Sequence, residues 1–220
     1  MTELIDLSGP EIGPASGGPA KKIIVFVHGY GADGNDLISL GQHFAQAVPD
    51  AAFISPNAPY RCDGSPYGYQ WYDVWMKDRE ERLAAIRSTA AIFDNFIDQQ
   101  LARHELAEED LVLVGFSQGT MMSLFTAPRR ENPVAGLVGY SGRMEAPDLL
   151  KDEIRSKPQV VMVHGDSDEL LPLSEMETAA AALRENGVAV DTHIRPGLGH
   201  GIDEEGIRIG LEFVETVFGS

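Results

Sequence analysis

The stretch LVLVGFSQG, residues 111–119, decides the fold of this chain. Its first four residues are all Leu or Val, as in a strand that is buried on both faces. Gly115 to Gly119 then follow the pattern G-x-S-x-G, and residues 118–126 predict a helix. A serine at such a strand-to-helix turn forms a nucleophile elbow, in which glycines allow the close approach of the backbones. A serine that only caps a helix is common, but it does not need the two glycines.

Further short apolar runs extend this unit into a sheet. Runs of this length, rich in Val and Ile and apolar on both faces, are typical of buried parallel strands. The predicted strands are residues 23–27, 51–55, 111–114, 134–140, 160–163 and 188–195.

Amphipathic stretches lie between the strands. The clearest, residues 79–103, repeats apolar residues every three or four positions from Leu83 to Leu101, which makes one apolar stripe. The predicted helices are residues 35–48, 79–103, 118–126, 174–186 and 203–218. This alternation predicts an α/β fold in a single domain over residues 1–220, with a mostly parallel central sheet and helices on both faces. Residues 8–19 are expected to form an irregular loop, and residues 56–78 an ordered, aromatic-rich loop.

Composition excludes several classes of protein. The chain has 34 Asp and Glu against 17 Lys and Arg, a net charge of −17, which argues against nucleic acid or an anionic membrane as the main partner. The single cysteine, Cys62, excludes an internal disulfide framework and a cysteine-rich zinc site. No apolar run reaches the roughly 18 residues of a spanning helix, so no stable membrane insertion is expected. The acidic residues 1–6 differ from a basic secretory signal, and we expect a cytoplasmic protein.

A serine nucleophile needs a base to take its proton, and His200 is the best candidate. It lies in the glycine-rich segment 197–201, between the last predicted strand and the last predicted helix. His28 also ends a strand, but it precedes Ser117, whereas this fold runs in the order Ser, acid, His. His164 ends another strand and is expected to pack beneath the loops.

The acid should lie at a strand end between Ser117 and His200. Asp166 and Asp168 both follow the strand at residues 160–163. Asp166 follows a glycine directly and is suited to shaping the turn, whereas Asp168 lies further out and reaches better towards His200. The acidic cluster here lacks the spacing of a calcium loop, so no metal site is expected.

A tetrahedral oxyanion needs two backbone N–H donors. One is expected from Gln118, at the start of the helix after the serine. The other is expected from Tyr30, because the glycines on both sides of it allow its N–H to point inward.

Taken in order along the chain, several motifs resemble the phospholipase/carboxylesterase family of α/β-hydrolases, which includes acyl-protein thioesterases. The motifs are His28-Gly29-Tyr30-Gly31, Pro56-Asn57-Ala58-Pro59, Gln70-Trp71-Tyr72-Asp73, Gly115-Phe116-Ser117-Gln118-Gly119, His164-Gly165-Asp166-Ser167-Asp168 and Gly197-Leu198-Gly199-His200. They span almost the whole chain, and only their combination is specific.

The resemblance implies an α/β-hydrolase without a large lid that cleaves carboxylic esters or thioesters without a cofactor. By the same resemblance, the triad is Ser117, Asp168 and His200, and the loop that holds Trp71 lines the substrate groove. Most of the other aromatic residues of that loop are expected to pack within it.

Two positions depart from many members of the family. Glu169 follows the acid where a proline is common, and Tyr30 stands where leucine is common. Leu170 and Leu171 then stand where smaller residues often line the acyl channel. We expect these changes to affect which acyl groups fit and to leave the triad chemistry unchanged.

The sequence therefore predicts a serine esterase that acts on a small acyl ester or an acylated substrate. A lysophospholipase and a peptidase-like serine hydrolase are the alternatives within the same chemistry. A non-catalytic binding protein on the same fold is the alternative from another class, because a fold does not guarantee a reaction. The sequence leaves the oligomeric state open.

Overall fold

The computed structural model describes residues 5–62 and 67–219, so the acidic start at residues 1–4 and the centre of the predicted aromatic loop at residues 63–66 lie outside it. In these ranges seven strands form one sheet in the order β1-β3-β2-β6-β7-β8-β9, which is parallel except for β1. The strands are β1 (Glu11–Ile12), β2 (Lys22–Val27), β3 (Ala51–Ile54), β4 (Tyr60–Arg61), β5 (Tyr69–Gln70), β6 (Leu111–Phe116), β7 (Gly136–Tyr140), β8 (Gln159–Gly165) and β9 (Val190–Arg195). The mostly parallel α/β fold is confirmed.

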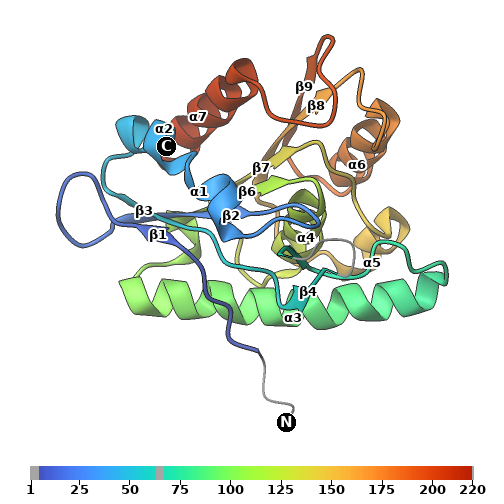
Figure 1. Cartoon of the computed structure of the whole chain (residues 1–220), viewed down its shortest axis with the longest axis horizontal. Helices are drawn as coiled ribbons and strands as arrows, with labels where there is room; N and C mark the ends of the chain where they lie inside the picture. Colours follow the sequence, from blue (N-terminus) through green and yellow to red (C-terminus); the bar gives the residue numbers. More distant parts are fainter. Residues whose placement is uncertain (1–4, 63–66, 220) are drawn as a thin grey trace.

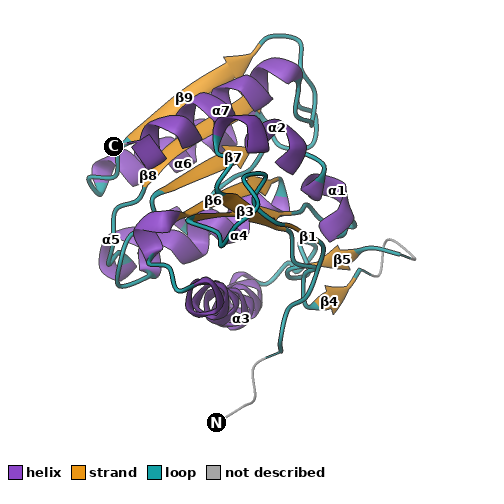
Figure 2. Ribbon diagram, turned by 90° about the vertical axis from the view of Figure 1, so that its left-hand side faces the viewer, coloured by secondary structure: helices purple, strands orange, loops and turns teal. Residues whose placement is uncertain are grey.

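Helices cover both faces of the sheet (Figure 1), with α1, α2 and α7 on one side and the long α3 on the other. The helices are α1 (Gly34–Ile38), α2 (Gly41–Ala47), α3 (Arg79–His104), α4 (Gln118–Thr126), α5 (Leu150–Glu153), α6 (Leu173–Glu185) and α7 (Glu204–Gly219), with 3-10 turns at Glu108–Asp110, Ala127–Arg129 and Pro147–Leu149. Seen along α3, the sheet separates α3 and α4 from α7 and α2 (Figure 2).

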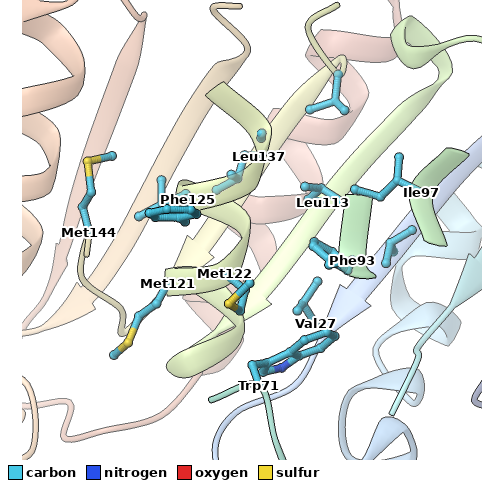
Figure 3. Close-up of a cluster of buried hydrophobic side chains, with 14 of the residues drawn as sticks. Val27, Trp71, Phe93, Ile97, Leu113, Met121, Met122, Phe125, Leu137 and Met144 are labelled. Carbon is cyan, nitrogen blue, oxygen red and sulfur yellow. The ribbon is translucent and has the colours of Figure 1, made fainter. Parts of the chain in front are cut away.

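The core has two halves because successive side chains of a strand point to opposite faces. In β2, Ile23 and Val25 belong to the half of the core that also includes side chains of α3, α4 and α6, whereas Ile24 and Phe26 belong to the half that includes side chains of α1, α2 and α7. Figure 3 shows part of the first half, in which Phe93 of α3 and Met122 of α4 pack over the sheet. The central strands are therefore apolar on both faces, as the sequence predicts.

One predicted helix is wrong as a single element. Residues 35–48 form two short helices, because the chain tightens after Ile38 into i→i−3 bonds such as Leu40 N–H to Leu37 C=O at 3.0 Å. This turn places Gly41 against the ring of Phe53 and lets both Leu37 and Phe44 reach the core.

The outer strands also differ from the prediction. Residues 190–195 are an edge strand with β8 as the partner in the sheet, and Ile194 is exposed, so this run is not buried on both faces. Residues Glu11–Ile12 lie in the segment expected to be irregular, yet they add an antiparallel edge to β3. The β4–β5 hairpin lies within the long aromatic loop. Strands of two residues are too short to show a period in the sequence.

Candidate active site

Ser117 lies at the sharp turn between the end of β6 and the start of α4. Its backbone φ of 53° and ψ of −117° are unusual for a residue with a side chain and indicate strain that the packing around the turn sustains. The closest approach is at Gly119, where a Cβ would lie 1.8 Å from the carbonyl oxygen of Val27 in β2. The glycine thus lets α4 start directly against the sheet and holds the serine above the strand end.

The structure brings Ser117, His200 and Asp168 into one hydrogen-bonded chain. The Nε2 atom of His200 lies 2.9 Å from Ser117 Oγ, and its Nδ1 atom lies 2.8 Å from Asp168 Oδ2. These side chains follow β6, β8 and β9, whose carboxyl ends meet at one edge of the sheet. The Asp168 side chain is fully buried and that of His200 is 16% exposed, so the imidazole lies at the border between the interior and solvent.

Hydrogen bonds to the buried Asp168 carboxylate favour its ionised form. Burial by itself would raise the pKa of this carboxyl, but hydrogen bonds from the Leu171 N–H, from His200 and from the Leu170 N–H outweigh it, and the pKa lies below its ordinary value. Both backbone N–H groups donate to Oδ1 at 2.9 Å, which leaves Oδ2 to face the imidazole. The orientation of the carboxylate is therefore set by the backbone of its own loop.

Asp166, the alternative acid, does not face His200. It is exposed, and its Oδ1 accepts hydrogen bonds from the Gly197 N–H at 2.7 Å and from the Ser167 hydroxyl at 3.0 Å. It thus ties the loop after β8 to the loop after β9. Gly165 allows the same approach, since a Cβ there would lie 2.0 Å from the Leu198 carbonyl oxygen.

Two backbone N–H groups beside Ser117 are free to bind an oxyanion. Neither the Tyr30 N–H nor the Gln118 N–H donates a hydrogen bond within residues 5–62 and 67–219. The loop that carries Tyr30 lies directly against the serine, because a Cβ on Gly29 would lie 3.3 Å from Ser117 Cβ. The structure therefore leaves donors unpaired on the two segments where the sequence predicts them.

His28, the other candidate for the base, is buried and has a structural role instead. Its Nε2 accepts the Ala58 N–H at 3.0 Å, so the proton is on Nδ1, which donates to the Gly29 carbonyl at 2.8 Å. Burial lowers the pKa of this imidazole, which favours the neutral form. The Gly29 carbonyl and the Tyr30 N–H belong to one peptide plane, so His28 fixes the direction in which that N–H points.

A family model described as phospholipase/carboxylesterase matches residues 11–218. The chain belongs to the phospholipase/carboxylesterase family.

Similar proteins of this family carry related names. A crystal structure of esterase PE8 is 40% identical, covers 97% of this chain and all of its own, and superposes with a TM-score of 0.92. The esterase YpfH of Escherichia coli is 25% identical over 194 residues, 88% of this chain and 82% of its own length. Acyl-protein thioesterase 1 of Debaryomyces hansenii is 23% identical over 218 residues, 92% of this chain and 94% of its own length. These relatives place the chain among hydrolases of the esterase and thioesterase type.

The Trp71 side chain has no surface with which to touch a substrate, so it does not have the substrate-binding role expected of it; whether its loop lines a groove stays a prediction. Its side chain has no exposed surface, and its ring packs edge-on against Phe93 with 5.2 Å between centroids (Figure 3). Its indole N–H donates to the His28 carbonyl at 2.9 Å. The tryptophan therefore supports the Tyr30 loop from inside the core, and no spacing rule could have revealed a contact across 43 residues.

The side chain of Gln118 makes a contact that the sequence analysis missed. Its Oε1 accepts a hydrogen bond from the backbone N–H of Trp71 at 3.0 Å, and its Nε2 donates to the Tyr72 carbonyl at 2.7 Å. Both hydrogen bonds are buried. The residue whose backbone N–H flanks the serine thus also holds the Trp71 loop in place.

The remaining predicted substrate residues are placed differently from one another. Leu170 is 71% exposed, whereas Leu171 is half-buried and packs against the core. Among the other loop aromatics, Tyr72 is buried, but Trp75 and Tyr67 are 74% and 83% exposed and do not pack within the loop as expected.

Two further features concern partners and metals. None of the helices in the described ranges is long and apolar enough to span a membrane. In the same ranges, no group of three or more His, Cys, Asp or Glu side chains is arranged to hold a metal ion.

Proposed function

We propose that this chain is a serine hydrolase that cleaves carboxylic esters through an acyl-enzyme intermediate. The observation that carries the proposal is the continuous chain from Ser117 Oγ through His200 to Asp168, with separations of 2.9 and 2.8 Å, at a strained elbow. A structural serine would need neither an imidazole at its hydroxyl nor a buried carboxylate behind that imidazole.

In the first half of the reaction, Ser117 Oγ attacks the acyl carbon while His200 Nε2 takes the hydroxyl proton. Asp168 stabilises the imidazolium that forms, since its Oδ2 accepts the Nδ1–H. The carbonyl oxygen becomes an oxyanion, and we assign the Tyr30 and Gln118 N–H groups as its donors. The tetrahedral intermediate then collapses, the bond to the leaving group breaks, and His200 gives its proton to the departing alcohol or thiol.

In the second half, water takes the place of the leaving group. His200 removes a proton from the water as it attacks the acyl carbon, and then returns a proton to Ser117 Oγ as the carboxylic acid leaves. The serine and the neutral imidazole are restored, so both halves use the same groups.

We propose a small acyl ester or an acylated substrate, recognised mainly through its acyl part. The net charge of −17 does not attract an anionic headgroup or surface. A thioester remains within this proposal because the same triad serves both leaving groups, and a lysophospholipid is the alternative substrate. Kinetics with oxyesters and thioesters of increasing acyl length would separate these cases, since a narrow optimum in kcat/KM measures the size of the acyl site.

The decisive test is the hydrolysis of an aryl acetate by the Ser117→Ala variant. We expect turnover to fall to the background rate with an unchanged circular dichroism spectrum, whereas Ser174→Ala, an exposed serine on α6, should behave as the unmodified chain. A fluorophosphonate probe should label the unmodified chain at Ser117. Retained activity in the Ser117 variant, or no labelling of the folded chain, would instead favour a binding protein on a hydrolase fold.

A further inference from the structure

A second histidine faces the buried carboxylate of Asp168. His164 is the last residue but one of β8, and its side chain is 1% exposed. Its Nε2 lies 2.8 Å from the Leu171 carbonyl oxygen and 3.3 Å from Asp168 Oδ2. Asp168 Oδ2 is thus approached by two imidazoles, His200 from the solvent side and His164 from the strand.

The contacts of His164 determine where its proton lies. The Leu171 carbonyl can only accept, so Nε2 carries the proton and donates it. The other nitrogen, Nδ1, is buried and has no hydrogen-bond partner in residues 5–62 and 67–219. A proton on Nδ1 would therefore be an unpaired buried donor, which is unfavourable. The Nε2–H tautomer therefore fits this site, with its proton donated to the Leu171 carbonyl and its Nε2 atom 3.3 Å from Asp168 Oδ2.

The hydrogen bond from His164 to Leu171 ties the loop of the acid to the strand. The Leu171 N–H donates to Asp168 Oδ1 and the Leu171 carbonyl accepts from His164, so both peptide groups of Leu171 are fixed. The same Nε2 atom lies 3.3 Å from Oδ2. The loop from Asp168 to Leu171 is therefore anchored to β8, a strand paired on both sides, at the point where it must hold a carboxylate 2.8 Å from His200.

We infer that His164 is a positioning residue for the reaction proposed above: its Nε2–H holds the Leu171 carbonyl, and through this loop keeps the Asp168 carboxylate in the orientation that serves His200. His164 touches no reacting atom and acts through Asp168. The inference rests on the proposed function, because the orientation of Asp168 affects a rate only if the triad performs one.

A matched pair of amides tests this role. The side-chain nitrogen of glutamine reaches the position of a histidine Nε2, whereas that of asparagine reaches the position of Nδ1. His164→Gln therefore keeps the donor to the Leu171 carbonyl. His164→Asn carries the same amide group but lacks a donor at this position. For ester hydrolysis we expect His164→Asn to lower kcat by roughly 10- to 100-fold, the range typical when a buried partner of a functional side chain is lost. His164→Gln should recover most of this loss.

The Michaelis constant separates a positioning role from general damage. We expect KM in both variants to stay within about twofold of the unmodified value, because substrate binding does not involve Asp168. Rates should be expressed per active site titrated with the fluorophosphonate probe, so that unfolded protein does not count. Equal kcat values in the two variants, whether both unchanged or both reduced alike, would overturn the inference.

A measurement on the unmodified chain keeps the inference testable if the asparagine variant does not fold. Long-range proton–nitrogen NMR spectra of the imidazoles distinguish the two tautomers, and we expect His164 to carry its proton on Nε2. A proton on Nδ1 would overturn the inference. Loss of the proposed function would have a different signature, namely an unmodified chain that neither hydrolyses esters nor labels at Ser117.

Discussion

Replacing Asp168 by asparagine should inactivate the triad while leaving its geometry almost unchanged. The asparagine has to place its oxygen where Oδ1 is now, because that atom accepts two backbone N–H groups at 2.9 Å. Its NH₂ group then occupies the position of Oδ2, 2.8 Å from His200 Nδ1. A donor at this position forces Nδ1 to become an acceptor and moves the imidazole proton to Nε2, so His200 cannot take the Ser117 proton.

The expected loss follows from this change of tautomer. A triad whose histidine is held in the wrong tautomer loses about 10⁴-fold in kcat, equivalent to about 5 kcal/mol of transition-state stabilisation. The amide is similar in size to the carboxylate, so we expect KM to change little. The loss should therefore be in kcat.

The assay is the hydrolysis of an aryl acetate, with kcat and KM measured for Asp168→Asn and for Asp166→Asn. Asp166 is the matched control because it is two residues away, is exposed and keeps an acceptor for the Gly197 N–H as asparagine. Its substitution should change kcat by less than about threefold, as for a surface substitution. Equal losses in the two variants, or a larger loss for Asp166→Asn, would refute the choice of acid and the tautomer argument.

Four features of the structure lead to further predictions. Trp71→Phe should lower the free energy of unfolding by about 1–3 kcal/mol in urea titrations, because the buried His28 carbonyl loses its donor. It should also lower kcat, whereas Trp75→Phe, at an exposed position, should change neither quantity. Gly119→Ala should destabilise the fold by about 3 kcal/mol or more, since its Cβ would lie 1.8 Å from the Val27 carbonyl oxygen; an alanine variant that melts normally would contradict the packing at the elbow. The pKa of Asp168 is lower in the folded chain than its ordinary value of 3.8, so the stability that its ionised form contributes is present above that value and disappears as the pH falls through the folded pKa. The difference in unfolding free energy between the unmodified chain and Asp168→Asn should therefore be larger at pH 7 than at the lowest pH at which the fold survives. A difference that stays constant with pH would disprove this linkage. With a net charge of −17, the melting temperature should rise as NaCl is increased from about 50 mM to 1 M, because salt screens the excess repulsion; a melting temperature that falls would show that the ion pairs dominate.

Local patterns in the sequence predicted the main elements well. The stripe from Leu83 to Leu101 fixes α3, and the apolar run before Ser117 fixes β6, because each depends on the period of side chains along one element. Where a boundary depended on a neighbour, the prediction was wrong. The break between α1 and α2 accompanies the close packing of Gly41 on Phe53, a residue of another element.

The same division applies to the site. The sequence indicated a serine elbow, a histidine after the last strand and an acid between them, because these residues occupy strand ends whose order the fold dictates. It could not place Trp71, which resembled a groove residue but is buried beneath the Tyr30 loop. A side chain at a given position in a loop can face either way, and only the packing around it decides which.

The sequence by itself thus determined the class of fold, and it indicated the serine that we propose as nucleophile and the segments that reach it. The tertiary structure placed Asp168 against His200 and Asp166 against the Gly197 N–H, and it brought His164 within 3.3 Å of the Asp168 carboxylate. The physical reason is the range of the interactions. Periodicity and turn chemistry act within a few residues, whereas the hydrogen bond between Ser117 and His200 joins residues 83 positions apart. Its length depends on the order of the strands and on how closely their loops pack.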